Sequence, residues 1–345
     1  MMYTYEAAKQ FGPANRHWQG IPGIERTKNS RLFACLYSGG TGEQLGNYCV
    51  LLQSDDGGRT WADPVAAAYA GEAARAYDPC LWIDPLGRLW FFWAVMPNHA
   101  VYAAVCGDPD AATLAWSEVK HIAADIMMNK PTVLRDGTWL LPVAVWREGV
   151  HVLPDCVSPG EERLSFVYRS CDEGKTFQRV GGADVPDRRF DEHMLVEKND
   201  GALWMLVRTD YGIGQAFSRD GGATWSPGED SGLGGPCSRF FIRRLRSGHL
   251  LLINHVNFTG RDNLTALLSR DDGATWEGGL LLDGRAGVSY PDAVQADDNV
   301  VYAVYDRERY GAKEILMAKF TEADVLAGGI VSEEGALGMV VSKVE

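Results

Sequence analysis

Short apolar runs recur along the chain, and most of them are bounded by glycine or aspartate. Representative runs are RLFACLY, GRLWFFWAV, TWLLPVAVW, GALWMLVR and GHLLLINHV. Runs of this length and composition predict β-strands joined by tight turns. Only residues 321–328, TEADVLAG, predict a helix, with Thr321 as its N-terminal cap and Gly328 as its stop. No apolar run approaches the roughly 18 residues that cross a membrane, so we expect an all-β globular protein with no membrane partner.

One octapeptide pattern interrupts these strands four times. It reads Ser-x-Asp-x-Gly-x-Thr followed by Trp or Phe, and its copies are SDDGGRTW (54–61), SCDEGKTF (170–177), SRDGGATW (218–225) and SRDDGATW (269–276). The Ser and Asp side chains can bond nearby backbone amides, and the Gly can adopt a positive φ. The closing aromatic ring can pack inward. We call this pattern the Asp box and assign it to hairpin turns, with no catalytic role.

The spacing of the boxes indicates a repeat of about 50 residues, the length of one four-stranded propeller blade. The boxes at 54 and 170 are separated by about two such repeats, so residues 102–116, YAAVCGDPDAATLAW, are expected to belong to a blade with a degenerate box. The runs at 300–308 and 314–320 supply a sixth blade, which we expect an N-terminal strand to close. The chain is therefore predicted to be one domain, residues 1–345, folded as a six-bladed β-propeller with Asp-box hairpins.

Composition narrows the range of partners. The net charge is −13 and the Lys and Arg residues are dispersed, which disfavours nucleic acid and anionic membranes but leaves room for a small anionic substrate. The seven cysteines form no CxxC pair, so we expect reduced buried thiols rather than disulfides or a zinc site. No cofactor or metal is expected. The N-terminal segment lacks the apolar core of a secretion signal, and we expect a cytoplasmic location.

Ligands bind to a propeller where the inner strands of all blades meet. Polar residues gather at the predicted strand ends in segments 17–23, 39–44, 76–79, 128–132 and 190–208, and in a C-terminal group of Arg239, His255, Arg261, Tyr290 and Asp292. From these segments Gln19, Asp78, Lys130, His255 and Asp292 are candidate substrate contacts. His193 is a candidate general acid or base, a role that His255 could also fill.

Between the boxes the chain resembles the Asp-box (BNR repeat) sialidase-like family over most of its length. Residues 191–209, DEHMLVEKNDGALWMLVRT, match a segment in which a Glu precedes an Asp-Gly turn and a strand ending in Arg, here Glu192 and Arg208. Arg261 precedes a strand that leads into an Asp box, as in the family. Residues 289–306, SYPDAVQADDNVVYAVYD, resemble the family's nucleophile strand, with Tyr290.

The resemblance implies an exo-acting glycosidase that removes a terminal acidic sugar, sialic acid or a related sugar acid, from an acidic oligosaccharide. Tyr290 would be the nucleophile, Glu192 its base, and Glu43 the acid/base. Arginine binds carboxylates through bidentate charge-assisted hydrogen bonds, and the arginines expected to do so are Arg208, Arg261 and Arg239. A neutral tyrosine is not repelled by the substrate carboxylate, and tyrosine is a known exception to the usual carboxylate nucleophile.

The resemblance breaks in the first blade. The family begins this blade with Arg-Ile-Pro, whereas this chain reads GIPG, so Gly20 stands where an arginine is expected. The nearest residues that could replace the arginine are Gln19, Arg16 and His17.

Two other functions fit the same residues. A propeller polysaccharide lyase or rhamnosidase acting at a glucuronate linkage would use His193, His255 or Tyr290, with arginine neutralising the uronate. Elimination leaves an ultraviolet-absorbing unsaturated uronate, whereas hydrolysis does not. A non-catalytic carbohydrate-binding propeller is the third alternative.

Overall fold

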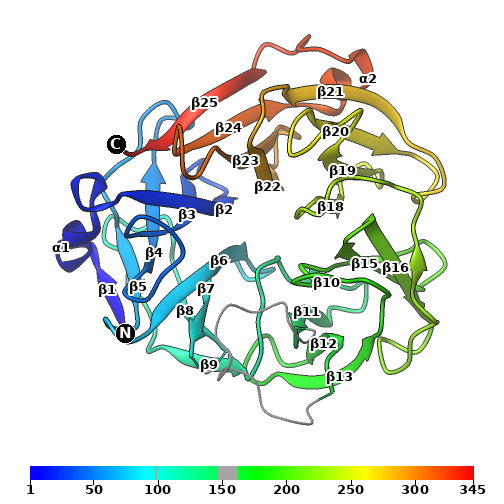
Figure 1. Ribbon diagram of the computed structural model, residues 1–345, viewed down its shortest axis with the longest axis horizontal. Helices are drawn as coiled ribbons and strands as arrows, with labels where there is room; N and C mark the ends of the chain where they lie inside the picture. Colours follow the sequence, from blue (N-terminus) through cyan, green and yellow to red (C-terminus); the bar gives the residue numbers. More distant parts are fainter. Residues whose placement is uncertain (98, 147–161) are drawn as a thin grey trace.

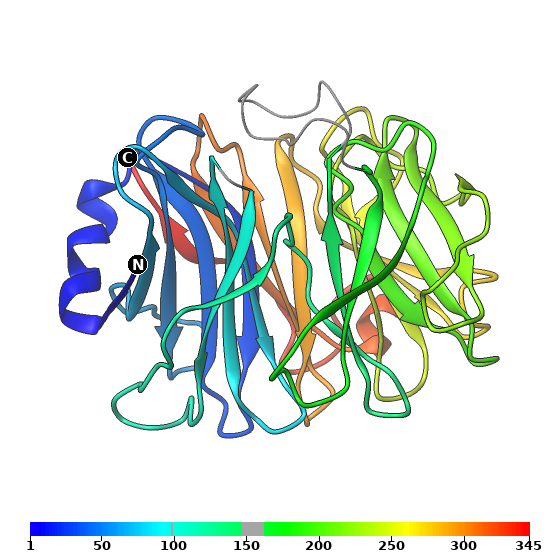
Figure 2. The same ribbon diagram turned by 90° about the horizontal axis from the view of Figure 1, so that it is seen from below.

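The computed structural model describes residues 1–97, 99–146 and 162–345. The strands of these residues form six antiparallel sheets that stand side by side around a central axis (Figure 1). Seen from the side, the sheets run roughly along that axis, and both termini lie on the same side of the ring (Figure 2). Each sheet is one blade, so the prediction of a six-bladed β-propeller is confirmed.

The first three blades follow the chain in order, and each begins at the axis. Blade 1 holds, from the axis outward, β2 (Trp18–Arg26), β3 (Leu32–Gly39), β4 (Tyr48–Ser54), β5 (Ala66–Tyr69) and β1 (Met2–Thr4). Blade 2 holds β6 (Arg75–Ile83), β7 (Leu89–Met96), β8 (Ala100–Cys106) and β9 (Lys120–Ala123). Blade 3 holds β10 (Thr132–Val133), β11 (Trp139–Ala144), β12 (Ser165–Ser170) and β13 (Gln178–Ala183).

The last three blades repeat this arrangement. Blade 4 holds β14 (Met194–Glu197), β15 (Leu203–Thr209), β16 (Gly212–Ser218) and β17 (Glu229–Asp230). Blade 5 holds β18 (Phe241–Arg244), β19 (Leu250–His255), β20 (Leu264–Ser269) and β21 (Glu277–Asp283). Blade 6 holds β22 (Val288–Gln295), β23 (Val301–Arg307), β24 (Glu314–Phe320) and β25 (Ala336–Lys343).

Few helices accompany the sheets. The predicted C-terminal helix is present as α2 (Glu322–Ala327). Thr321 caps it in a reciprocal pair of hydrogen bonds with Asp324, and Gly328 ends it with a φ of 69°. The sequence did not predict the short helices before the first blade, which are α1 (Tyr5–Ala8), η1 (Lys9–Phe11) and η2 (Pro13–Asn15).

The Asp boxes form the turns that connect β4 to β5, β12 to β13, β16 to β17 and β20 to β21. In the third box, Ser218 Oγ accepts from Gly222 N at 2.9 Å and donates to Asp220 Oδ1 at 2.8 Å. Asp220 also accepts from the amide and the hydroxyl of Thr224, at 2.9 and 2.6 Å. These bonds are closed within one turn, so the motif needs no distant residue to form.

The two blades without a box fill the same connection differently. In blade 2 the predicted degenerate unit continues past β8, where Cys106 pairs with Trp116 in an isolated bridge. In blade 6 the connection between β24 and β25 carries α2. All six blades are thus built on one plan, with local substitutions at the turn.

The expected closure of the ring by an N-terminal strand is wrong. Strand β1 pairs with β5 at the outer edge of blade 1, and blade 6 consists entirely of C-terminal strands. Strand β2 is the edge strand of blade 1 at the axis, so amides on its unpaired side can bind side chains. Asp306 accepts from Ile21 N, and Asp292 accepts from Ile24 N, both at 2.8 Å. Side-chain bonds across the junction therefore replace a shared sheet.

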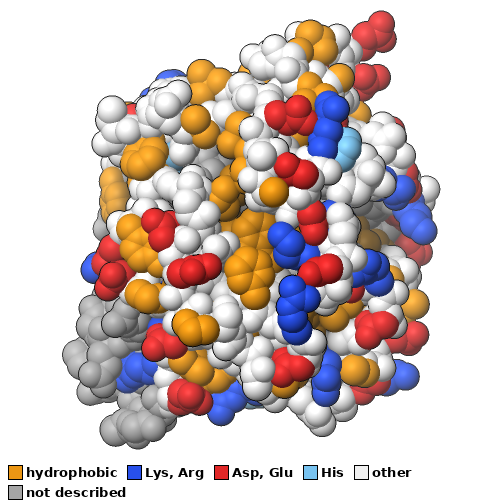
Figure 3. Space-filling model, turned by 90° about the vertical axis from the view of Figure 1, so that its right-hand side faces the viewer, with side chains coloured by type: hydrophobic (Ala, Val, Ile, Leu, Met, Phe, Trp, Pro, Cys, Tyr) orange, Lys and Arg blue, Asp and Glu red, His pale blue; other side chains and the backbone are white. Residues whose placement is uncertain are grey.

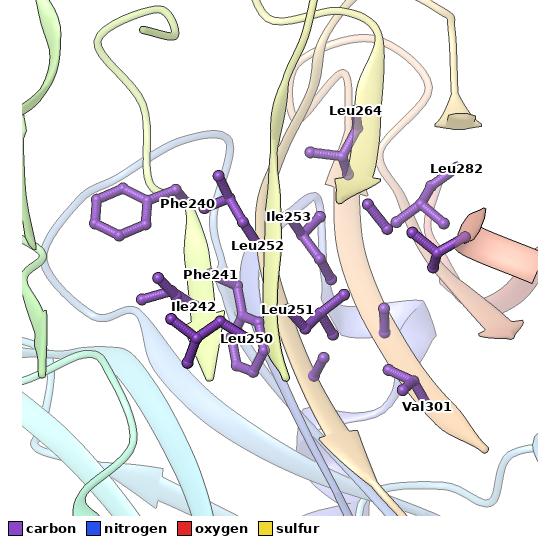
Figure 4. Packing of buried hydrophobic residues seen from close by; sticks show 14 of the residues in the cluster. Phe240, Phe241, Ile242, Leu250, Leu251, Leu252, Ile253, Leu264, Leu282 and Val301 are labelled. Carbon is purple, nitrogen blue, oxygen red and sulfur yellow. The ribbon is translucent and has the colours of Figure 1, made fainter. Parts of the chain in front are cut away.

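Apolar side chains fill the space between neighbouring blades. Figure 4 shows one such layer, in which residues of β18 and β19 gather with Leu264, Leu282 and Val301 from neighbouring strands. Burying one such side chain contributes about 1.5–3 kcal/mol. On the outside, Figure 3 shows acidic and basic side chains interspersed over the side formed by blades 4 and 5. No described helix has the length and apolar character needed to cross a membrane.

The cysteines depart in part from the expectation of buried thiols. The buried ones are Cys35, Cys49, Cys80 and Cys106, whereas Cys171 is exposed and Cys237 is half-buried. All six are free thiols. Cys156 lies outside the described residues.

Acid should unfold the Asp boxes in a predictable window. The hydrogen bond from Thr224 is the main cause that lowers the pKa of Asp220 from 3.8 to about 2. A lowered folded-state pKa stabilises the protein above pH 3.8, and this stabilisation is lost as the pH falls toward 2. Asp220→Asn should therefore lower the thermal midpoint at pH 7, and the difference from wild type should shrink between those two pH values. A difference that stays constant across that range would contradict this account.

Candidate active site

A cavity of about 700 Å³ opens at one end of the central channel. Its lining comes from first strands and the segments before them, and from the ends of second strands and the loops after them, in several blades. Antiparallel strands alternate in direction, so this end of the ring is opposite the Asp boxes. The polar and aromatic residues around the cavity include Glu43, Arg75, Tyr77, Asp78, Trp146, Phe190, Glu192, Arg208, Arg261, Tyr290, Arg309 and Tyr310.

Three of the predicted residues meet at the cavity wall in one hydrogen-bonded group. Tyr290 Oη donates to Glu192 Oε1 at 2.6 Å. Arg208 Nη1 donates to the same Glu192 oxygen at 2.6 Å and to Tyr290 Oη at 2.9 Å. All three side chains are buried. Glu192 and Arg208 belong to blade 4 and Tyr290 to blade 6, so only ring closure brings the tyrosine to the other two.

A shared backbone feature places residues on the cavity wall in three blades. Ile21, Asp78 and Tyr290 each have a positive φ, of 52°, 48° and 57° respectively, and each precedes a proline. The strand register shifts at each of these positions. Non-glycine residues in this region carry a strain of about 1–3 kcal/mol and cluster at functional sites. All three residues line the cavity.

The Tyr290 phenol is a neutral group in this environment. Burial is the main cause that raises its pKa to about 12, and the Glu192 carboxylate adds to the rise while Arg208 opposes it. Tyr290 therefore becomes a strong nucleophile only if its proton is removed as it reacts. Glu192 is in hydrogen-bond contact and can accept that proton.

Two further predicted carboxyl groups face the cavity. Glu43 lies on the loop after β3, 35% exposed, with Arg75 at 3.7 Å and Arg309 at 3.9 Å. Asp78 is buried, and burial, followed by the charge of Glu43, raises its pKa to about 8. Asp78 consequently holds a proton at neutral pH, whereas an ordinary aspartate does not.

Several residues of the cavity were not predicted from the sequence. Arg75 directly precedes the segment 76–79 that was singled out, and Arg309 follows β23 in the run DRERYG. Mixed charges of this kind usually mark a solvated turn, so nothing local distinguished Arg309. Trp146 packs against Phe190 with a centroid distance of 5.1 Å and forms an apolar part of the wall.

Three predicted substrate contacts lie beneath the cavity, in the centre of the channel. Lys130 Nζ lies 2.6 Å from Glu25 and 3.1 Å from Asp292, and Arg239 lies 3.7 Å from Asp292. Lys130 also donates to the carbonyls of Ile24 and Leu81. All are buried and absent from the cavity lining. The geometry makes them a central ion cluster that joins the blades, because their charges are satisfied by one another.

The remaining predicted residues also lie outside the cavity lining. Gln19 bonds Lys313 O and Ser342 Oγ at the junction of blades 1 and 6. His193 Nε2 contacts Phe166 O at 2.8 Å, and burial is the main cause that lowers its pKa to about 4. His255 Nδ1 contacts Asp262 O at 2.6 Å, and burial lowers its pKa as well. Both imidazoles are neutral, and each is hydrogen-bonded to a backbone carbonyl.

Removing Lys130 should destabilise the fold. Lys130→Met removes the cation of the Glu25 carboxylate and leaves Asp292 with only the longer contact to Arg239, a change that costs about 3–5 kcal/mol. Urea unfolding should show this loss of free energy, while the exposed ion-pair variant Lys343→Met should change it little. If Lys130→Met instead weakens ligand binding at unchanged stability, Lys130 is a substrate contact.

Asp78 should make stability depend on pH. Its raised pKa stabilises the folded protein below pH 3.8, and this stabilisation is lost as the pH rises through about 8. Asp78→Asn has no carboxyl group to ionise. The thermal midpoint of wild type should therefore fall relative to that of Asp78→Asn as the pH rises from 4 to 9. Parallel midpoint curves for the two proteins would show that Asp78 is ionised in the fold.

Comparison with known proteins agrees with the architecture. The family model described as BNR repeat-like domain matches residues 30–303. Among proteins with curated descriptions, none matches the sequence. A protein of unknown function from Dyadobacter fermentans is 20% identical with a TM-score of 0.64, and the match covers 86% of this chain and 92% of that one.

Two solved trans-sialidases share the fold at lower identity. The leech intramolecular trans-sialidase is 14% identical with a TM-score of 0.71, over 94% of this chain and 71% of that one. The intramolecular trans-sialidase from Ruminococcus gnavus is 14% identical with a TM-score of 0.70, over 91% and 96%. At such identity the likeness shows the fold alone. The family model, which spans most of the chain, shows more: this protein belongs to the BNR repeat-like family.

Proposed function

We propose that the protein is an exo-acting glycoside hydrolase that removes a terminal acidic sugar, sialic acid or a related sugar acid, from a glycan. The observation that carries the proposal is the group formed by Tyr290, Glu192 and Arg208 on the wall of the cavity. A buried phenol in contact with a carboxylate and a guanidinium has the parts of an activated nucleophile.

In the first step Tyr290 Oη attacks the anomeric carbon, and its proton passes to Glu192 over the 2.6 Å hydrogen bond. The glycosidic C–O bond breaks, and the leaving oxygen takes a proton from a cavity carboxyl group. Water then cleaves the tyrosyl–sugar bond, giving its proton to that carboxylate while Glu192 returns its proton to Tyr290. Both protons are thereby restored.

Glu43 is the proposed acid/base of these steps. Glu43 and Asp78 are the two cavity carboxyl groups without a short ion pair, and Glu43 is the more exposed of them. Its loop lies at the mouth of the cavity, where a leaving group can depart. Asp78 lies deeper and holds a proton, which suits hydrogen bonding to a sugar hydroxyl.

The cavity is cationic around the nucleophile, which favours an acidic sugar. The guanidinium of Arg261 lies 5.4 Å from the centroid of the Tyr290 ring, and Arg208 contacts its hydroxyl. The leech trans-sialidase structure holds 2,7-anhydro-Neu5Ac, and the R. gnavus structure holds oseltamivir carboxylate. An acidic glycan is accordingly the proposed partner.

The lyase alternative is less well supported by the geometry. His193 and His255 are neutral, bonded to backbone carbonyls and outside the cavity lining. Tyr290 alone would then have to abstract and deliver the proton. A non-catalytic carbohydrate-binding function would not require the hydrogen bond between Tyr290 and Glu192.

Loss of the nucleophile or its base should abolish turnover without unfolding the protein. Glu192→Gln should lower kcat by about 10²–10⁴-fold, the usual effect of losing a general base, and Tyr290→Phe should lower it at least as much. A panel of fluorogenic α-sialosides and related keto-sugar acid glycosides measures this. The matched control is Tyr305→Phe, which removes a buried hydroxyl bonded to Asp283 outside the cavity.

Full activity in both cavity variants would rule out the tyrosine mechanism. Products that absorb in the ultraviolet from a glucuronate-containing polymer would identify elimination instead. Saturable glycan binding with no turnover of any substrate would identify a binding module.

A further inference from the structure

We propose that Arg309 binds the carboxylate of the substrate beside Tyr290, and that Gly20 is required because it leaves the space that Arg309 occupies. This inference rests on the proposed function for the identity of the substrate. It concerns a residue that no local sequence pattern distinguished and a glycine that stands where the resemblance predicts an arginine.

Arg309 is placed directly over the reacting residue. Its guanidinium carbon lies 4.0 Å from the centroid of the Tyr290 ring, closer than that of Arg261 at 5.4 Å. Arg309 sits in the β23–β24 loop, on the cavity side of blade 6, and lines the cavity. A carboxylate on the carbon that Tyr290 attacks would therefore lie within reach of both guanidinium groups.

The Arg309 side chain is held in place at one edge and lacks a hydrogen-bond partner at another. Nε donates to Asp306 Oδ2 at 2.7 Å, and Asp306 is itself fixed by Ser289 Oγ and Ile21 N. Nη2 is buried and has no hydrogen-bond partner among the described residues. A buried guanidinium N–H without an acceptor is costly, and a substrate oxygen can satisfy it.

Gly20 is what allows this position. A Cβ on Gly20 would lie 2.7 Å from Arg309 Cδ and Nε, a separation that forces the arginine to move. The backbone of Gly20 is not in the positive-φ region, so its own conformation does not require glycine. The requirement comes from Arg309, which reaches across the junction from blade 6 into the space above blade 1.

The charges around Tyr290 favour a bound anion. Four cations line the cavity, namely Arg75, Arg208, Arg261 and Arg309. Arg208 pairs with Glu192 and Arg309 with Asp306, whereas Arg261 forms no ion pair with a described carboxylate. The guanidinium groups therefore outnumber their short ion-pair partners, which attracts an anionic substrate group.

Calorimetry with two carboxylate probes tests the proposal. Binding of the dehydrated sialic acid analogue and of its methyl ester is measured by calorimetry and reports on the sugar. Binding of pyruvate is measured by saturation-transfer NMR and reports on the carboxylate alone. Arg309→Met should weaken binding of the acid by about 10- to 100-fold, the range for a lost charge-assisted hydrogen bond, and should abolish the preference for acid over ester. Arg285→Met, which removes a cation paired with Asp283 outside the cavity, is the matched control.

The double variant isolates the role of Gly20. Gly20→Ala should weaken acid binding in the wild-type background, because the methyl group displaces a flexible side chain, and should have no further effect in Arg309→Met. Additive losses would show that Gly20 does not act through Arg309. Equal affinity of Arg309→Met and wild type for the acid would overturn the clamp itself.

The outcomes separate this proposal from the proposed function. If wild type binds pyruvate through Arg309 but not the sialic acid analogue, the clamp stands and the sugar is a different acid. If wild type binds neither carboxylate, the clamp is wrong. If both probes bind through Arg309 and no acidic glycoside is turned over, the clamp stands and the hydrolase proposal fails.

Discussion

Lys130 at the centre of the channel is the contact on which the ring depends. Its ammonium group bonds the Glu25 carboxylate, the Asp292 carboxylate and the carbonyls of Ile24 and Leu81. These groups belong to blades 1, 2 and 6, while Lys130 precedes the first strand of blade 3. A buried charge is tolerated only when its partners are all in place, so the cluster ties the correct closure of the ring to the neutralisation of its own charges.

In the cavity above this cluster, the arginines are less completely paired with carboxylates. Below, each ion has an oppositely charged neighbour. Above, Arg261 forms no ion pair with a described carboxylate, and one buried N–H of Arg309 has no hydrogen-bond partner among the described residues. Strained residues before Pro22, Pro79 and Pro291 turn the inner strands of three blades at this level. The buried ion cluster joins these strands at their centre and can support such strain, which a looser scaffold would relax.

The Asp-box turns and the candidate site lie at opposite ends of the propeller. The Asp boxes close hairpins at one end through bonds within single turns, and the cavity is lined at the other end from several blades. Loops at the cavity end can therefore differ without loss of the repeat. This separation explains how a chain 14% identical to trans-sialidases keeps their fold, and why the fold by itself does not specify the substrate.

The sequence by itself determined the repeat, the blade count and the C-terminal helix, because the Asp box and the Thr321 cap are made of bonds between residues a few positions apart. It also placed Glu192, Arg208 and Tyr290 in order along the chain. Tertiary structure alone decided that these three side chains meet, that Lys130, Arg239 and Asp292 neutralise one another beneath the cavity, and that Arg309 lies over Gly20. Tyr290 reaches the Glu192–Arg208 pair from another blade, and the other contacts also join different blades. They therefore exist only after the ring has closed, and no local pattern can encode them.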